Sequence, residues 1–313
     1  MKKIPVIAVV GPTASGKTKL AIEICKRHNG EVISADSMQI YRYMSIGTAK
    51  PDEEEMEGIP HHLMDFVTPG ESFSVAKYVQ LAREKIEDIH SRGKLPVVAG
   101  GTGLYVDSLL GNIQFSDSKG DEAIREELSR IAAEKSPQVL WDMLNEIDPD
   151  TAQTLHPNNV WRVVRAIEVY RLTGKTMKET QEESRRLPSP YNSLLIGMNY
   201  RDRAVLYDRV NRRVDIMMEK GLLDELKMLL DMGFTGTARQ AIGYKELMPY
   251  IEGAVPLDVC VDTLKQESRR YAKRQLTWFR RNEKINWIYG DDYDDTAQIF
   301  DKADNLIAFA DMM

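Results

Sequence analysis

Residues 11–18 read Gly-Pro-Thr-Ala-Ser-Gly-Lys-Thr and match the pattern G-x-x-x-x-G-K-[ST], which restricts the possible folds of this chain more than any other segment does. The apolar residues 4–10 before it predict a strand, and the apolar spacing of residues 17–28 after it predicts a helix. Glycines let backbone N–H groups turn inward, the helix N-terminus adds positive potential, and Lys17 adds a point charge. We therefore predict a phosphate loop for a diphosphate or triphosphate, with the Thr18 hydroxyl available to Mg²⁺.

Strand-like and helical segments alternate through much of the chain, which is typical of an α/β protein. The strand-like segments are residues 4–10, 31–35, 95–99, 194–198 and 285–289. Helical patterns at residues 74–92 and 104–110 separate some of them. We predict a P-loop NTPase-like core, with a mostly parallel sheet flanked by helices.

The alternation stops between residues 116 and 192. Three amphipathic helices are expected there with no strand between them, at residues 121–134, 137–146 and 158–172. Strand patterning resumes afterwards, so we predict an all-helical insertion domain (116–192) in a core made of residues 1–115 and 193–313. The core is expected to end with a long helix, residues 257–281, and a last strand.

Composition excludes several classes of protein. No apolar run approaches the roughly 20 residues of a membrane span, and the apolar N-terminal stretch runs directly into the phosphate loop, so we expect neither a membrane anchor nor a signal peptide. Cys25 and Cys260 lack CxxC spacing, which argues against zinc or disulfides and fits a reducing cytoplasm. The net charge of −6 argues against general nucleic-acid binding but permits a local basic patch. The adjacent His61 and His62 are given no catalytic role.

Two further segments are expected at the same edge of the sheet as the phosphate loop. Asp36 follows the second strand, where a carboxylate faces the ligand crevice of a parallel sheet. It could bind Mg²⁺, act as a general base, or cap the following turn, and its position does not choose between the first two roles. Residues 100–103 read Gly-Gly-Thr-Gly after another strand, and they put the Thr102 hydroxyl near the crevice.

The helix expected at residues 267–281 has a cationic face. Its cations are Arg269, Arg270, Lys273, Arg274, Arg280 and Arg281. At about 100° per residue they fall within an arc of about 140°, while Tyr271 and Trp278 fall on the arc expected to face the core. No acidic residue lies between Ser268 and Arg281, so the stripe predicts a surface for RNA or DNA.

An ordered set of segments resembles the tRNA dimethylallyltransferase (tRNA isopentenyltransferase) family nearly from end to end. The segments are Gly11-Pro-Thr-Ala-Ser-Gly-Lys-Thr18, Ser34-Ala-Asp-Ser-Met-Gln-Ile-Tyr41, Ile46-Gly-Thr-Ala-Lys-Pro51, Gly100-Gly-Thr-Gly-Leu-Tyr105, His156-Pro-Asn-Asn159, Arg165-Ala-Ile-Glu-Val169, Arg239-Gln-Ala-Ile-Gly-Tyr-Lys-Glu246 and Lys273-Arg-Gln-Leu-Thr-Trp-Phe-Arg280. The first is shared with many kinases, whereas the ordered set is specific. The resemblance implies transfer of a dimethylallyl group from dimethylallyl diphosphate to the exocyclic amine of the adenine 3′ of the anticodon in some tRNAs.

The resemblance also implies residue roles. Asp36 would be the general base, Thr102 would orient the flipped adenine, and Lys17 with Mg²⁺ beside Thr18 would stabilise the leaving diphosphate. Arg213 would assist the leaving group, although Arg209 could fill the same role. The diphosphate would lie on Gly11, Pro12, Thr13, Ala14, Ser15, Gly16, Lys17 and Thr18.

Residues that contact tRNA are implied in both domains. They are Asp36, Ser37, Met38, Gln39, Thr102, Arg125, Trp161, Arg162, Val163, Val164, Arg165, Arg239, Gln240, Gly243, Tyr244, Lys273, Arg274, Gln275, Trp278 and Arg280. The expected partners are a tRNA anticodon stem-loop and dimethylallyl diphosphate, with no membrane, and the protein is expected to be a cytoplasmic monomer. The chain lacks the C-terminal zinc finger of eukaryotic relatives, so it resembles a bacterial form.

Three other functions compete with this interpretation. A small-molecule kinase could use the same loop for ATP, but it would not need the cationic helix. An enzyme that prenylates free adenine nucleotides would have less use for the insertion. An RNA-binding module without activity would leave the phosphate loop and Asp36 unexplained.

Overall fold

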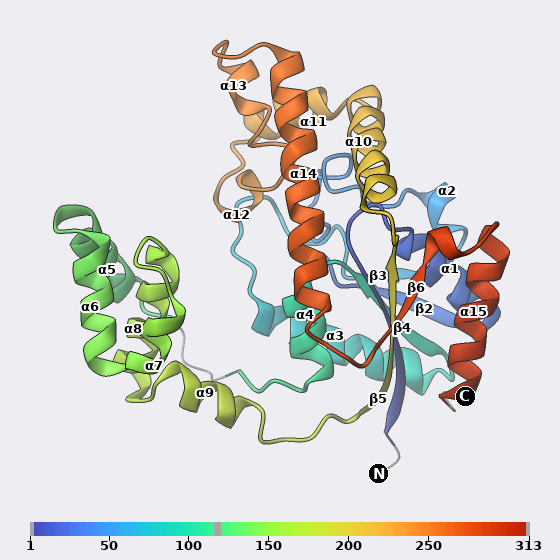
Figure 1. The fold of residues 1–313 in the computed structure, drawn as a ribbon, viewed down its shortest axis with the longest axis horizontal. Coiled ribbons are helices and arrows are strands. Elements are labelled where there is room, and N and C mark those ends of the chain that lie inside the picture. Colours follow the sequence, from blue (N-terminus) through green and yellow to red (C-terminus); the bar gives the residue numbers. More distant parts are fainter. Residues whose placement is uncertain (1–2, 116–119, 311–313) are drawn as a thin grey trace. The chain divides into compact units, whose positions relative to one another are not determined.

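The computed structural model describes residues 3–115 and 120–310, and their central element is a parallel sheet (Figure 1). Its strand order is β3-β2-β4-β1-β5-β6. The strands are β1 (Ile4–Val10), β2 (Gly30–Ser34), β3 (His61–His62), β4 (Leu95–Gly100), β5 (Tyr191–Asn199) and β6 (Ile285–Tyr289). The predicted α/β fold is confirmed. The chain runs from β1 to β2 on one side of β1, and later crosses from β4 past β1 to β5 on the other side. The strand order thus reverses at β1, so the ligand crevice is expected at the carboxyl end of β1.

Helices cover both faces of the sheet. One face packs against α1 (Lys17–Arg27) and α15 (Thr296–Phe309), and the other against α3 (Val75–Ser91) and α4 (Gly103–Leu110) (Figure 1). Burial on both sides explains why the central strands are continuous apolar runs. We expected the chain to end with a strand, which is wrong, because α15 follows β6 and packs on α1.

The edge strand β3 was not predicted, because two residues are too short to show an alternating pattern. It pairs with β2 and brings His62 to Glu31, where Nε2 lies 2.7 Å from a carboxylate oxygen. Arg92 and Lys94 donate to the same carboxylate at 2.6 and 2.7 Å. His62 and the two cations therefore hold this edge of the sheet together through Glu31.

A layer of helices follows β5 in the sequence and has its own core. It consists of α10 (Arg203–Glu219), α11 (Leu222–Asp231), α12 (Gly236–Arg239), α13 (Met248–Ile251) and α14 (Leu257–Phe279). Its apolar core includes Ile40, Tyr41 and Met44 from the segment between β2 and the short helix α2 (Glu53–Met56). The segment after β2 is thus fixed between the sheet and this layer, in which α10 and α14 run side by side (Figure 1).

Residues Gly111–Ser189 form a separate compact unit, which begins a few residues before the insertion that we predicted. Its helices are α5 (Glu122–Glu134), α6 (Pro137–Ile147), α7 (Pro149–Thr154), α8 (Val160–Thr173) and α9 (Met177–Ser184). The short helices α7 and α9 were not predicted. Leu128, Leu140, Leu144 and Val163 form its fully buried core. None of the described helices, in either unit, is long and apolar enough to cross a membrane.

Candidate active site

The phosphate loop joins β1 to α1 and has the backbone that its glycines allow. Gly11 and Gly16 have φ angles of 148° and 94°, which residues other than glycine rarely adopt. A Cβ atom on Gly11 would lie 2.3 Å from the carbonyl oxygen of Met198 on β5. The Ser15 hydroxyl is buried and has no hydrogen-bond partner in the described part of the chain. A buried polar atom without a partner fits a loop that is shaped for a polar guest.

Two cations share the space beside this loop. Lys17 donates to the carbonyl of Pro12 at 3.2 Å, and Arg213 donates to the Thr13 hydroxyl at 3.2 Å. Burial, together with the charge of Arg213, lowers the pKa of Lys17 to about 8, while Asp36 acts in the opposite direction. Burial also lowers the pKa of Arg213. The site therefore disfavours its own positive charge, and an anion on the loop would relieve this.

The tip of the loop is also tied to the helical layer. The Thr13 N–H donates to Oε1 of Gln275 at 2.8 Å, and Nε2 of Gln275 donates to the carbonyl of Gly101 at 3.0 Å. Gln275 is buried, so we revise its predicted role from RNA contact to a bridge between the two glycine-rich loops. Arg209 is exposed and donates to the carbonyl of Ala14 at 3.0 Å. Arg213 lines the cavity that Asp36 also lines, whereas both arginines line a second depression on the other side of the loop, along residues 16–19.

Asp36 uses its two carboxylate oxygens differently. Oδ1 accepts the N–H groups of Met38 at 2.9 Å and Gln39 at 3.3 Å, which caps the turn after β2. Within residues 3–115 and 120–310, Oδ2 has no hydrogen-bond partner, and Asp36 lines the cavity. Thr102 accepts the Ser37 N–H at 3.0 Å and does not line the cavity, so here it holds the turn in place.

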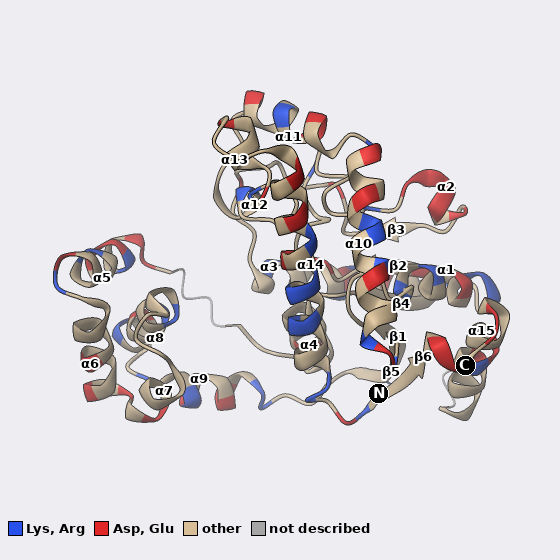
Figure 2. Ribbon diagram, turned by 45° about the horizontal axis from the view of Figure 1, so that its top comes forward, with Lys and Arg blue, Asp and Glu red and all other residues tan. Residues whose placement is uncertain are grey.

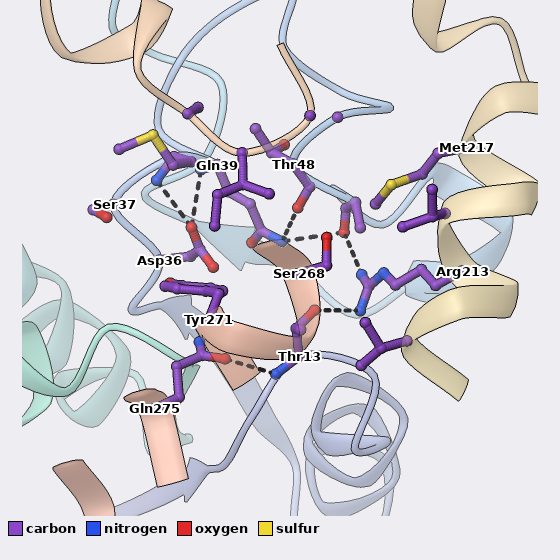
Figure 3. A pocket seen from close by; sticks show the side chains of 18 of the residues that line it. Thr13, Asp36, Ser37, Gln39, Thr48, Arg213, Met217, Ser268, Tyr271 and Gln275 are labelled. Carbon is purple, nitrogen blue, oxygen red and sulfur yellow. Dashed lines mark hydrogen bonds between the residues drawn. The ribbon is translucent and has the colours of Figure 1, made fainter. Parts of the chain in front are cut away.

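The cavity has a volume of about 340 Å³ and is lined by both glycine-rich loops, the turn at Asp36, α10 and α14. Figure 3 shows Asp36 and Tyr271 on one side of it, with Arg213 and Met217 on the other. Val210 and Val214, on the same face of α10, make part of the wall apolar. We expected Tyr271 to face the core, which is wrong, because it lines this cavity. The site thus combines an anion-binding end with a carboxylate and an apolar wall.

Positions 264, 268, 271 and 275 of α14 repeat at helical spacing, and all four line the cavity. That spacing was a signal for Ser268 and Tyr271, but it was masked by the cations between them. Lys245 and Thr48 also line the cavity; both lie in segments that carry the resemblance, but neither was given a role in the site.

A basic hollow lies along α14, where Figure 2 shows a band of cationic residues. The hollow is lined by Arg270, Lys273, Arg274, Thr277, Trp278 and Arg281. Arg274 also lines the cavity, so the two depressions meet there. Arg281 stacks 4.1 Å from the ring centre of Trp278, whose Nε1 donates to Asp107 at 2.8 Å.

The predicted single stripe of six cations is only partly correct. Arg269 turns toward α10 and donates to Asn211 at 2.6 Å. Arg280 is exposed but does not line the hollow. Arg270 and Arg281 do line it; they belong to the predicted stripe but not to the tRNA contacts that the resemblance implied. The hollow thus has a different set of cations from the one that the resemblance implied.

The residues predicted to contact tRNA in the small unit differ in exposure. Trp161 is 75% exposed, and Arg162 beside it is exposed as well. Arg125 and Arg165 each lie 2.7 Å from the buried carboxylate of Glu168. Val163 and Val164 are buried in the core of the unit, so we remove their side chains from the predicted RNA contacts.

The segment after α11 also divides into cavity and core residues. Gln240 and Gly243 line the cavity, and Arg239 is exposed. Tyr244 is fully buried and donates its hydroxyl to Glu225 at 2.8 Å, so its side chain is also removed from the RNA contacts.

A phosphate loop, an uncommitted carboxylate oxygen and a cationic helix surround connected depressions in this fold. Together they define a group-transfer enzyme for a phosphorylated substrate, with a surface suited to a polyanion. Among residues 3–115 and 120–310, no group of three or more His, Cys, Asp or Glu side chains is placed to hold a metal ion.

Comparison with known proteins identifies the family within this class of enzyme. Residues 39–282 match the model of the family described as IPP transferase. The tRNA dimethylallyltransferase of Acetivibrio thermocellus is 55% identical over 296 residues, which cover 94% of each chain. The tRNA dimethylallyltransferase of Halalkalibacterium halodurans is 51% identical over 301 residues, covering 96% of this chain and 94% of the relative.

Solved structures agree with these relatives. The full-length tRNA isopentenylpyrophosphate transferase of Bacillus halodurans has a TM-score of 0.74 at 48% identity, with 99% of this chain and 97% of that chain covered. A eukaryotic dimethylallyltransferase acting on tRNA has a TM-score of 0.83 at 32% identity, with 97% and 80% covered. The chain belongs to the tRNA dimethylallyltransferase family, and it is a prenyltransferase.

Proposed function

We propose that the enzyme transfers a dimethylallyl group from dimethylallyl diphosphate to the exocyclic amine of the adenine immediately 3′ of the anticodon in a subset of tRNAs. The observation that supports this most directly is the shared cavity of Lys17, Arg213 and Asp36, which meets the basic hollow at Arg274. A donor bound on the loop and an acceptor bound to α14 would then meet at Asp36.

The diphosphate would lie on the N–H groups of residues 13–18, beside Lys17 and Arg213. Negative charge grows on it as the allylic carbon–oxygen bond breaks, and these cations would stabilise that charge. Thr18 is exposed and lines the cavity, and its hydroxyl is the side-chain group that would hold a Mg²⁺ ion. Such an ion would supply further charge stabilisation for the leaving group.

The adenine amine is a poor nucleophile because its lone pair is delocalised into the ring. It would attack the allylic carbon as diphosphate leaves, and its proton would pass to Oδ2 of Asp36. The free Oδ2 atom favours this base role over a purely capping role. Thr102 would act by holding the turn at Ser37, with which it shares a hydrogen bond.

The tRNA would be bound by the basic hollow and by Trp161 with Arg162 in the small unit. Phosphates would contact the cations, and an unstacked base could stack on the exposed indole of Trp161. A tRNA substrate would place the work of the enzyme in the cytoplasm.

The proposal can be tested with Mg²⁺, dimethylallyl diphosphate and unmodified tRNA, by measuring the mass of the digested nucleosides. One added prenyl group on the adenine next to the anticodon is expected. A parallel reaction with AMP as acceptor separates the enzyme from those that prenylate free nucleotides. Absence of prenyl transfer to any tRNA, together with ATP-dependent phosphorylation of a small acceptor, would favour the kinase instead.

A further inference from the structure

A buried glutamate outside the cavity holds part of the cavity wall. Glu225 lies in the first turn of α11, and its residue surface is 8% exposed. Its carboxylate accepts three successive backbone N–H groups, from Ser45 and Ile46 at 2.8 Å each and from Gly47 at 2.9 Å. Tyr244 donates a fourth hydrogen bond, at 2.8 Å.

This arrangement fixes the shape of the segment. Successive N–H groups that converge on one anion form a nest, and a buried carboxylate is costly unless such donors satisfy it. Gly47 also packs on Tyr244, because a Cβ atom at Gly47 would lie 2.5 Å from the Tyr244 ring. One carboxylate therefore joins residues 45–47 to the segment that contains the cavity residues Gln240 and Gly243.

The next two residues, Thr48 and Ala49, connect residues 45–47 to the cavity. Ala49 is left-handed, with φ 48°, a conformation that a non-glycine residue adopts only when its surroundings hold it there. Its carbonyl accepts Nε2 of Gln39 at 3.1 Å and Nη2 of Arg213 at 3.4 Å. Nε2 of Gln39 also lies 3.3 Å from the carbonyl of Thr48.

Gln39 and Arg213 lead directly to the two proposed chemical groups. The Gln39 N–H donates to Oδ1 of Asp36, and Arg213 donates to Thr13 on the phosphate loop. Figure 3 shows Gln39, Thr48 and Arg213 around the same cavity. A continuous chain of contacts thus runs from Glu225 through the Ala49 carbonyl to both sides of the reaction.

We propose that Glu225 is a positioning residue for prenyl transfer, which sets the places of Arg213 and Gln39 through the nest at residues 45–47. The inference rests on the proposed function only for the chemical roles of Arg213 and Asp36. Glu225 lines neither the cavity nor the basic hollow, so we expect it to act on the rate and on diphosphate binding rather than on tRNA affinity.

The test compares Glu225→Gln with the wild type. Glutamine keeps the shape but replaces one acceptor oxygen with an NH₂ group that faces N–H donors, so the nest should loosen. Because displacement by about 1 Å can cost about 100-fold, we expect kcat to fall about 10- to 100-fold. Inorganic diphosphate should bind more weakly by calorimetry, while the Kd for tRNA stays unchanged.

Glu31→Gln is the matched control. Glu31 is also a buried glutamate with several partners, but they are cationic side chains at the edge of the sheet. This variant should lower the Tm and leave kcat and diphosphate affinity unchanged. If Glu225→Gln lowers only the Tm in the same way, the positioning role is wrong.

A double-mutant cycle with Arg213→Lys separates positioning from general loss of stability. If Glu225 acts through Arg213, the combined loss of kcat will be smaller than the product of the single losses, whereas independent effects multiply. Should Glu225→Gln fail to fold, Tyr244→Phe removes one of the four hydrogen bonds and should slow turnover by about 2- to 10-fold. A wild type that never prenylates tRNA would refute the proposed function, while diphosphate affinity would still test the position of Arg213.

Discussion

At the scale of single residues, Asp36 has a structural task as well as a proposed chemical one. Its Oδ1 atom holds the turn to Met38 and Gln39, and its Oδ2 atom is the proposed proton acceptor. An asparagine keeps an acceptor at Oδ1 but cannot take a proton. The two tasks are therefore separable by one substitution.

Asp36→Asn should lose about 10²- to 10⁴-fold in kcat, the usual contribution of a general base, while tRNA affinity and Tm stay near those of the wild type. Single-turnover prenylation measures the loss of rate, and filter binding measures the tRNA affinity. The matched control is Asp295→Asn, since Asp295 likewise accepts a backbone N–H, that of Gln298 at 2.9 Å, but begins α15. Undiminished turnover of Asp36→Asn would remove this residue from the base role.

Lys17 gives a prediction about pH. Because burial and Arg213 lower its pKa to about 8, the side chain is charged below that pH and neutral above it. Binding of inorganic diphosphate to the free enzyme should therefore weaken as pH rises through about 8. Calorimetry across this range measures the effect, and Lys17→Arg, which stays charged, controls for ionisation of the ligand itself. The same pH dependence in both proteins would mean that Lys17 is not responsible.

At the scale of elements, α14 serves two surfaces at once. Ser268, Tyr271 and Gln275 face the cavity, while Arg270 and Lys273 line the basic hollow. The helix is placed for this by Gln275, which ties it to the phosphate loop. Binding of RNA along the hollow would thus act on an element that also shapes the donor site.

Neutralising the hollow should weaken tRNA binding and make it less sensitive to salt. For Lys273→Gln with Arg281→Gln we expect the slope of log K against log salt to fall by about 0.7 to 0.9 per lost phosphate contact. Lys302→Gln, an exposed lysine on α15, is the control for the change of charge. Arg280→Gln should have a smaller effect, because Arg280 lies outside the hollow. An equal effect at Arg280 would contradict the hollow as the binding site.

The sequence predicts those elements whose signal is local. The strand β1 and the phosphate loop follow from an apolar run and a fixed motif, and both were found where expected. By contrast, α15 has an ordinary amphipathic pattern that we overlooked, and β3 exists only because β2 pairs with it. A pairing partner far along the chain leaves no periodic trace in a two-residue segment.

The same distinction between local and distant signals applies to the residues of the site. Lys17, Asp36 and the cations of α14 carry charge or belong to motifs, so they could be singled out. Gln275 and Glu225 gain their roles from partners 262 and about 180 residues away in sequence, a separation that no local pattern encodes. Helical spacing alone also assigned Tyr271 to the core, because it cannot tell a core from a cavity beside it.

At the scale of the whole molecule, the net charge of −6 means that the protein as a whole repels tRNA. Attraction of tRNA must therefore come from local surfaces. We propose one such surface in each of the two units of the chain. The basic hollow lies in the larger unit, whereas Trp161 belongs to the smaller one. No residue of the hollow contributes to the core in which α8 packs.

Trp161→Ala should weaken tRNA binding by about 1 to 3 kcal/mol, the usual value of one stacked base, without changing the Tm, because the indole is 75% exposed. Val163→Ala, two positions along α8, is the matched control. It should lower the Tm with little effect on tRNA binding, because Val163 is buried. Combined with Lys273→Gln and Arg281→Gln, the binding loss at Trp161 should add in free energy, since the residues share no partners. Measured Kd values for the full set decide this, and an unchanged Kd for Trp161→Ala would mean that the small unit binds tRNA by other residues.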